Sequence, residues 1–98
     1  MPTRQSYIYI MSNFANSTLY TGVCNNLVKR VWQHRNGQGS VFTKKYSVTK
    51  LVYYEVFEEI IEAIIREKQI KGGSRADKLK LITQFNPTFK DLYNDISK

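Results

Sequence analysis

The sequence has only one cysteine, Cys24, among its 98 residues. One cysteine excludes an internal disulfide and a zinc site built on paired cysteines. No apolar run approaches the roughly 20 residues that a membrane-spanning helix needs. The first residues, MPTRQSYIYIMSN, contain no apolar stretch long enough for a signal peptide. We therefore expect a cytoplasmic protein, and the length fits a single domain over residues 1–98.

Acidic residues are absent from the first half of the chain. Residues 1–50 contain seven Lys and Arg, whereas residues 51–98 contain eight basic and eight acidic residues, so the net charge of +7 arises in the first half. Soluble surfaces normally mix the two signs, and a surface that lies against phosphates has a reason to exclude carboxylates. The pattern favours a nucleic-acid partner over chance clustering in a generally basic protein. A membrane partner is disfavoured because no predicted helix combines a basic face with a bulky apolar one.

The order of predicted elements indicates an α+β domain, in which helices pack on a small three-stranded antiparallel sheet. Runs of β-forming residues predict strands over residues 7–11, 19–23 and 51–57. Apolar spacing and capping residues predict helices over residues 27–36, 58–71 and 75–85. Asn86 before Pro87 predicts a short final helix that ends at Leu92. The Gly-, Ser- and Lys-rich segment 37–50 predicts a basic loop.

Glu67 is a carboxylate at an unexpected position. On the predicted helix it follows Ala63 by four residues and Ile64 by three, so it shares the face that Ile60, Ala63 and Ile64 are expected to turn toward the core. A carboxylate on that face needs a cation, hydrogen-bond donors or a metal ion. An ion pair with Lys71, four residues later, is the simpler alternative.

Arg30 and His34 lie one helical turn apart. A fixed cation and a titratable imidazole in this arrangement can face one ligand, where Arg stabilises charge on a phosphate and His moves a proton. A solvated surface helix is the alternative explanation.

Tyr7, Tyr9 and Tyr20 fall in the first predicted hairpin, with Tyr7 and Tyr9 on one face of their strand. Their rings could pack across the strands. Alternatively, their hydroxyls could face a phosphate or their rings could stack on bases.

Several short motifs follow one another in a fixed order. Tyr7-Ile8-Tyr9 and Tyr20-Thr21-Gly22 lie on predicted strands, and NNLVKRVWQH and AIIREKQIK lie on predicted helices. HRNGQG, Thr43, LVYYE and RADKLKLI followed by NP complete the series. Together, over some eighty residues, they resemble the GIY-YIG nuclease superfamily, and within it the small bacterial single-domain branch. Tyr7 stands in place of the first motif's glycine and Thr21 in place of the second motif's isoleucine, which leaves Tyr9 and Tyr20 in their positions.

The resemblance implies a metal-dependent endonuclease that hydrolyses DNA phosphodiester bonds with one Mg²⁺ or Mn²⁺ ion. The implied catalytic residues are Tyr9, Tyr20, Arg30, His34, Glu67 and Asn86. Glu67 would be the metal ligand, and Asn86 is explained nearly as well by its predicted role as a helix cap. The residues expected to hold the phosphate backbone are Lys29, Arg35, Lys44 and Lys45. Relatives act in excision repair and in mobile-element homing, so a role in DNA repair or recombination is expected.

The resemblance also implies roles for these side chains. Arg30 would stabilise charge on the non-bridging oxygens, and Tyr9, assisted by His34 or Tyr20, would take a proton from the attacking water. The sequence leaves open whether Tyr9 or His34 is the general base. Two other functions remain open: a nucleic-acid-binding module with little or no catalysis, and a module whose basic face docks an acidic protein.

Overall fold

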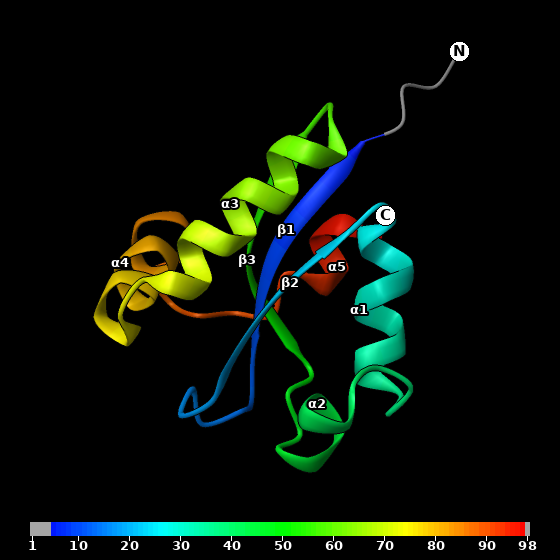
Figure 1. The fold of residues 1–98 in the computed structure, drawn as a ribbon. Helices are drawn as coiled ribbons and strands as arrows, with labels where there is room; N and C mark the ends of the chain where they lie inside the picture. Colours follow the sequence, from blue (N-terminus) through cyan, green and yellow to red (C-terminus); the bar gives the residue numbers. More distant parts are fainter. Residues whose placement is uncertain (1–4, 98) are drawn as a thin grey trace.

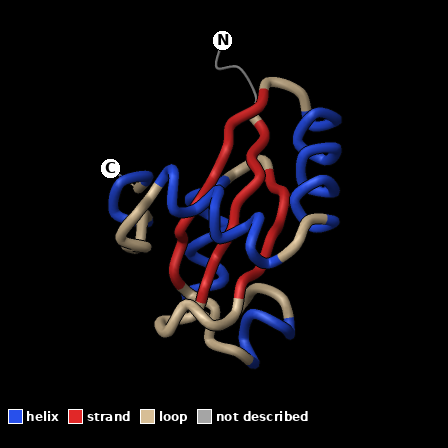
Figure 2. Tube along the Cα trace, turned by 90° about the vertical axis from the view of Figure 1, so that its left-hand side faces the viewer, coloured by secondary structure: helices blue, strands red, loops and turns tan. Residues whose placement is uncertain are grey.

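The structure is a computed structural model that describes residues 5–97. A three-stranded antiparallel sheet forms the centre of the molecule (Figure 2). Its strands are β1 (Ser6–Ser12), β2 (Leu19–Cys24) and β3 (Lys50–Phe57). β1 lies between the other two, so β2 is an edge strand. The register places Tyr9 opposite Gly22 on β2 and opposite Tyr54 on β3. The predicted α+β class and the three predicted strands are confirmed.

The sheet separates two hydrophobic clusters because successive side chains of a strand point to opposite faces. Tyr9 and Met11 of β1 belong to one cluster, and Ile8 and Ile10 belong to the other. The first cluster is completed by α1 (Leu27–Arg35) and by Leu92, next to the short helix α5 (Tyr93–Ile96). The second is covered by α3 (Ile60–Gly72) and α4 (Arg75–Phe85), which lie together on one side of the sheet (Figure 1).

Helix boundaries follow the predicted capping residues. The Asn26 side chain accepts a hydrogen bond from the Lys29 N–H at 3.1 Å, which begins α1. Gly37, with φ of +72°, follows its end. Ser74 and Asp77 form a reciprocal capping box at the start of α4. Among residues 5–97, no helix is both long and apolar enough to cross a membrane.

Two local predictions are wrong. The segment expected to be a loop contains a short helix, α2 (Val41–Lys45), whose first turn is held by the Ser40 side chain as it accepts from the Thr43 N–H at 3.1 Å. Asn86 does not begin a helix: it ends α4, with its own N–H bonded to the Ile82 carbonyl at 2.6 Å. The reason is tertiary, since the Asn86 side chain donates to the Val52 carbonyl of β3 at 3.2 Å.

The buried face of α3 also differs from the prediction. Ala63 and Ile70 are buried, whereas Ile60 and Ile64 are 44% and 37% exposed. This helix carries isoleucines on several sides, so its hydrophobic pattern does not define one face. In the observed orientation, Arg66 of α3 forms an ion pair with Glu55 of β3, with Nε 2.9 Å from Oε1.

Candidate active site

Tyr9 and His34 form the centre of the site. Tyr9 projects from β1 beneath α1 and is fully buried, and His34, near the end of α1, is 3% exposed. The Tyr9 hydroxyl and His34 Nε2 lie 3.0 Å apart, within hydrogen-bond distance. His34 is therefore not part of a solvated surface. Two residues that are distant in the sequence share one buried polar contact.

Thr43 contacts the other edge of the imidazole. Its Oγ1 lies 2.9 Å from His34 Nδ1, and its hydroxyl donates to the Ser40 carbonyl at 3.0 Å. Thr43 is buried, although it belongs to the segment predicted as a loop. The short helix α2 thus supports the side of His34 that faces away from Tyr9.

Two glycines allow these rings to approach so closely. A Cβ at Gly22 would lie 2.5 Å from Cζ of Tyr9, and a Cβ at Gly39 would overlap His34 Nδ1 and lie 2.6 Å from its Cε1. Gly22 belongs to the second sequence motif. Gly39 was not predicted as a site residue, and only the glycine itself, between polar residues, signals a close approach in the sequence.

Tyr20 and Arg30 complete a cluster around the buried pair. The Tyr20 ring on β2 lies 6.3 Å from the Tyr9 ring and 5.4 Å from the His34 ring, measured between centroids. Arg30, one turn before His34 on α1, is half-buried. Its guanidinium acts electrostatically on both Tyr9 and His34. The structure therefore brings together four of the predicted site residues.

The electrostatics of the pair favour neutral side chains. Burial raises the pKa of Tyr9 well above its ordinary value, and the nearby guanidinium of Arg30 only partly opposes this rise. Burial and the charge of Arg30 both lower the pKa of His34 below 6.5. At neutral pH a phenol therefore faces a neutral imidazole, which has one nitrogen able to accept a proton.

Glu67 lies on α3, which packs against β1 and β2 from the opposite face of the sheet. Its Oε2 forms an ion pair with Lys71 Nζ at 2.9 Å, and its side chain is 14% exposed. The predicted ion pair is therefore present. Among the contacts of residues 5–97, none joins Glu67 to the Tyr9–His34 pair.

A hollow of about 470 Å³ connects α1 with the start of α3. Arg30 lines it together with Glu58, Glu59 and Ile60. Glu67 follows Ile60 by seven residues, or about 10 Å along the helix axis. Because Tyr20 of β2 contacts His34 of α1 and α3 packs on β2, the two helices flank this edge strand (Figure 1).

Asn86 is buried at the end of α4, and its side-chain amide is occupied by structural contacts. Nδ2 donates to the carbonyls of Val52 and Lys90 at 3.2 and 2.8 Å, and Oδ1 accepts from the Lys90 N–H at 3.3 Å. These bonds tie the C-terminal segment to β3. These structural hydrogen bonds are enough to explain a buried asparagine at this position, and its catalytic role stays a prediction.

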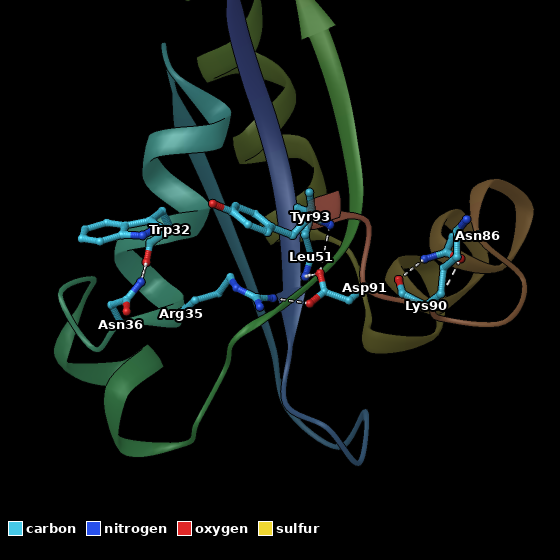
Figure 3. A network of polar contacts seen from close by, with 8 residues as sticks. All are labelled: Trp32, Arg35, Asn36, Leu51, Asn86, Lys90, Asp91 and Tyr93. Atoms are coloured by element: carbon cyan, nitrogen blue, oxygen red, sulfur yellow. Dashed lines mark hydrogen bonds and ion pairs between the residues drawn. The ribbon is translucent and has the colours of Figure 1, made fainter. Parts of the chain in front are cut away.

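The predicted phosphate-binding residues have different surroundings. Lys29, Lys44 and Lys45 are exposed. Arg35 is also exposed, but it forms an ion pair with Asp91, and its guanidinium lies 4.6 Å from the centre of the Tyr93 ring (Figure 3). Arg35 thereby connects α1 to the C-terminal segment.

Comparison with known proteins identifies the same family that the sequence motifs resemble. The family model described as GIY-YIG catalytic domain matches residues 5–80. The UPF0213 protein of Staphylococcus saprophyticus is 45% identical over 78 residues, which cover 80% of this chain and 94% of that protein. The UPF0213 protein of Syntrophus aciditrophicus is 42% identical over 84 residues, covering 85% and 94%.

A solved structure supports the fold. The solution NMR structure of the UPF0213 protein from Bacillus halodurans matches with a TM-score of 0.57 over 96% of this chain and 98% of that one, at 24% identity. The match to the family model includes both tyrosine motifs, the helix that carries Arg30 and His34, and Glu67. The chain therefore belongs to the GIY-YIG catalytic-domain family.

Proposed function

We propose that this protein is a divalent-metal-dependent endonuclease that hydrolyses phosphodiester bonds in DNA. Membership of the GIY-YIG family implies a nuclease-type activity. The observation that carries the proposal is the buried contact of the Tyr9 hydroxyl with a neutral His34, beside the guanidinium of Arg30. A pure binding surface does not require a buried proton acceptor next to a phenol.

The proton path follows from the pKa directions. A free Tyr9 phenolate is unfavourable in this buried position, because burial raises the pKa of Tyr9. Tyr9 therefore accepts the proton of the attacking water as its own proton passes to His34 Nε2. The water oxygen forms the new bond to phosphorus, the bond to the leaving oxygen breaks, and a solvent proton neutralises that oxygen. Tyr9 contacts the water in this scheme, while His34 is the final acceptor.

Arg30 is suited to stabilise charge on the phosphate. It is half-buried and lines a hollow of about 470 Å³, where a guanidinium is screened less than on an open surface. Donors that face the oxygens on which charge develops commonly contribute 10²- to 10³-fold in rate, or about 3–4 kcal/mol. Tyr20, beside His34, would limit the access of water to the pair.

The residues present fit a hydrated Mg²⁺ or Mn²⁺ ion at Glu67. Among residues 5–97, no group of three or more His, Cys, Asp or Glu side chains gathers as a metal cage. Mg²⁺ does not need one, since it keeps several waters and often uses one or two carboxylates. The Glu67 carboxylate is partly exposed, and the ion pair with Lys71 engages Oε2. When bound, the ion would neutralise the scissile phosphate and the leaving oxygen.

The basic residues of α1 and α2 would hold the nucleic-acid backbone. Lys29, Lys44 and Lys45 are exposed and lie in the half of the chain that contains no acid. Phosphate contacts of this kind fix the position of the substrate and carry little sequence information. A cytoplasmic location and a role in DNA repair or recombination are part of the proposal.

Nicking of supercoiled plasmid tests the proposed function. We expect the protein to nick DNA with Mg²⁺ or Mn²⁺ and not in EDTA. Tyr9→Phe, Arg30→Ala and Glu67→Gln should each slow nicking by about 10² to 10³-fold. Tyr7→Phe and Glu62→Gln are matched controls outside the site and should behave as wild type.

Three outcomes would count against the proposal. Equal rates for Glu67→Gln and wild type would remove the metal site from Glu67. Cleavage of an RNA duplex in preference to DNA would contradict the substrate. Binding with a steep salt dependence but no cleavage under any metal condition would indicate a nucleic-acid-binding module instead.

A further inference from the structure

We propose that Thr43 is a positioning residue, whose hydroxyl fixes His34 in the tautomer that carries its proton on Nδ1 and leaves Nε2 free to accept from Tyr9. The catalytic consequence rests on the proposed function. The tautomer itself is a property of the folded protein and can be measured without substrate.

The hydrogen bonds around Thr43 determine the direction of its contact with His34. The Thr43 hydroxyl has one hydrogen, which it donates to the Ser40 carbonyl at 3.0 Å. The Ser40 hydroxyl donates to Thr43 Oγ1 at 3.2 Å. One lone pair of Oγ1 remains, and it faces His34 Nδ1 at 2.9 Å. With the Thr43 hydrogen on the Ser40 carbonyl, we assign the nitrogen as the donor, because two lone pairs cannot share a hydrogen bond.

The opposite edge of the ring then has only one possible role. With its proton on Nδ1, the neutral imidazole presents a lone pair at Nε2, which accepts from the Tyr9 hydroxyl at 3.0 Å. In the other tautomer, Nε2–H would donate to the Tyr9 oxygen, and Nδ1 and Thr43 Oγ1 would meet as two acceptors. Tyr9 could then not pass its proton to the ring.

Thr43 is buried and is held in place by hydrogen bonds of its own backbone. Thr43 is 1% exposed, so water does not compete for His34 Nδ1. Its backbone N–H donates to the Ser40 side chain at 3.1 Å, and its carbonyl accepts from the Val48 N–H at 2.9 Å. Gly39 packs against the same edge of the ring, where a side chain has no room. The segment predicted as a loop therefore contains a short helix, α2, whose Thr43 side chain contacts Nδ1 of His34.

A hydroxyl at Nδ1 has a different electrostatic effect from a carboxylate. The titratable groups around His34 are Tyr9 of β1, Tyr20 of β2 and Arg30 of α1, and α2 contributes the neutral Thr43. None of these is a carboxylate. The contact with Thr43 therefore selects one tautomer of His34 without stabilising the imidazolium. The ring stays a neutral acceptor until a proton reaches it.

NMR of the imidazole tests the tautomer directly. His34 is the only histidine in the sequence, so ¹⁵N-histidine labelling yields the signals of one ring. In the wild type we expect Nδ1 in the protonated range and Nε2 in the unprotonated range at neutral pH. A wild-type spectrum with the proton mainly on Nε2 would overturn the proposal without any mutation.

Thr43→Val and Thr43→Ser separate tautomer selection from packing. Valine keeps the shape and removes the hydroxyl, so the Nε2–H form should become populated and nicking should slow by on the order of 10²-fold. Serine restores the hydroxyl and should restore both the tautomer and most of the rate. If folded Thr43→Val kept the wild-type tautomer, the proposal would fail. If the tautomer changes as expected while wild type never nicks DNA, the positioning role stands and the proposed nuclease activity fails.

Discussion

Each face of the sheet carries a buried tyrosine, but the two tyrosine hydroxyls have different partners. On the face of α1, Tyr9 contacts a neutral histidine. On the face of α3, Tyr53 donates to the Glu55 carboxylate, which is itself bound by Arg66 at 2.9 Å. Burial and, after it, the hydrogen bond and negative charge of Glu55 together raise the pKa of Tyr53 to about 12, although Arg66 opposes part of the rise. Two similar residues on one sheet thus have unlike neighbours.

The partner decides what each tyrosine can do. Burial raises the pKa of Glu55, but the hydrogen bonds from Arg66 and Tyr53 outweigh burial and leave it below 4.5, so this carboxylate is a poor acceptor for a phenol proton. That network joins β3 to α3 and holds its charges in place. Among residues 5–97, the hydrogen-bond contacts of the His34 ring are the hydroxyls of Tyr9 and Thr43 and include no carboxylate, and the neutral ring keeps a lone pair on one nitrogen. The two tyrosines therefore differ in their neighbours: Tyr9 contacts a neutral nitrogen base, whereas Tyr53 contacts a carboxylate that is already bound by a cation.

Gly22→Ala should have the largest effect, because it changes the face that carries Tyr9 and His34. The new Cβ would lie 2.5 Å from Cζ of Tyr9, whose buried ring has no room to retreat. We expect a loss of about 1–3 kcal/mol in the free energy of unfolding from overpacking, together with loss of nicking. Urea unfolding and the plasmid assay measure the two effects.

Gly72→Ala is the matched control for that substitution. A Cβ there meets nothing within 4 Å, and the residue ends α3 away from both tyrosines. Alanine should leave nicking unchanged and leave stability equal or higher by up to about 1 kcal/mol. A Gly22→Ala protein with wild-type stability and activity would contradict the close approach of Tyr9.

Arg66→Met should lower the stability of the α3 face of the sheet without changing the Tyr9–His34 contact. It leaves Glu55 without its cation while keeping an unbranched side chain about as long as the apolar stem of arginine. Lost hydrogen bonds to a charged group cost about 1.5–3 kcal/mol, so unfolding should occur at lower urea concentration. The His34 tautomer measured by NMR should not change. A shifted imidazole signal in this variant would show that the two faces are coupled.

The pH dependence of stability should divide between the faces. His34 has a lowered pKa in the folded state, so the unfolded chain binds its proton more readily, and stability falls as pH drops below about 6.5. One such proton contributes a slope of at most about 1.4 kcal/mol per pH unit. Glu55 also has a lowered pKa, so its contribution is present above about 4.5 and is lost as pH falls further.

Two variants separate these pH windows. His34→Gln should remove the slope just below pH 6.5 and keep the lower one, and Glu55→Gln should do the reverse. Chemical unfolding at a series of pH values gives both slopes. Identical pH profiles for His34→Gln and wild type would show that His34 is not buried as a neutral ring.

Elements with a strong local signal could be predicted from the sequence. The β1 alternation placed Tyr9 and Ile8 on opposite faces, and Ser74 set the start of α4 through a local capping box. The prediction that Asn86 begins a helix was wrong. Asn-Pro is a common helix start, but the Asn86 side chain instead bonds to the Val52 carbonyl, 34 residues away in the sequence. Contacts at that separation leave no local pattern.

The site could be predicted in part for the same reason. Tyr9, Tyr20, Arg30 and His34 lie in motifs that resemble the family, and the structure places them around one contact. Thr43 and Gly39 could not be given roles, because α2 has only five residues and its helix depends on contacts with Ser40 and His34. The buried face of α3 could not be predicted because isoleucines lie on several sides of the helix, and its ion pair with Glu55 joins residues distant in the sequence.

Replacing single cations should give the smallest effect and sharpen the comparison within the basic half. Lys44→Gln and Arg35→Gln each remove one positive charge, but Lys44 is exposed while Arg35 is held by Asp91 and Tyr93. Binding to a duplex oligonucleotide in EDTA can be followed by anisotropy at several salt concentrations. Lys44→Gln should reduce the slope of log K against log salt by about 1, and Arg35→Gln should reduce it less. If net charge alone governed binding, the two variants would be indistinguishable, so equal slopes would remove the distinction between a phosphate-binding lysine and a structural arginine.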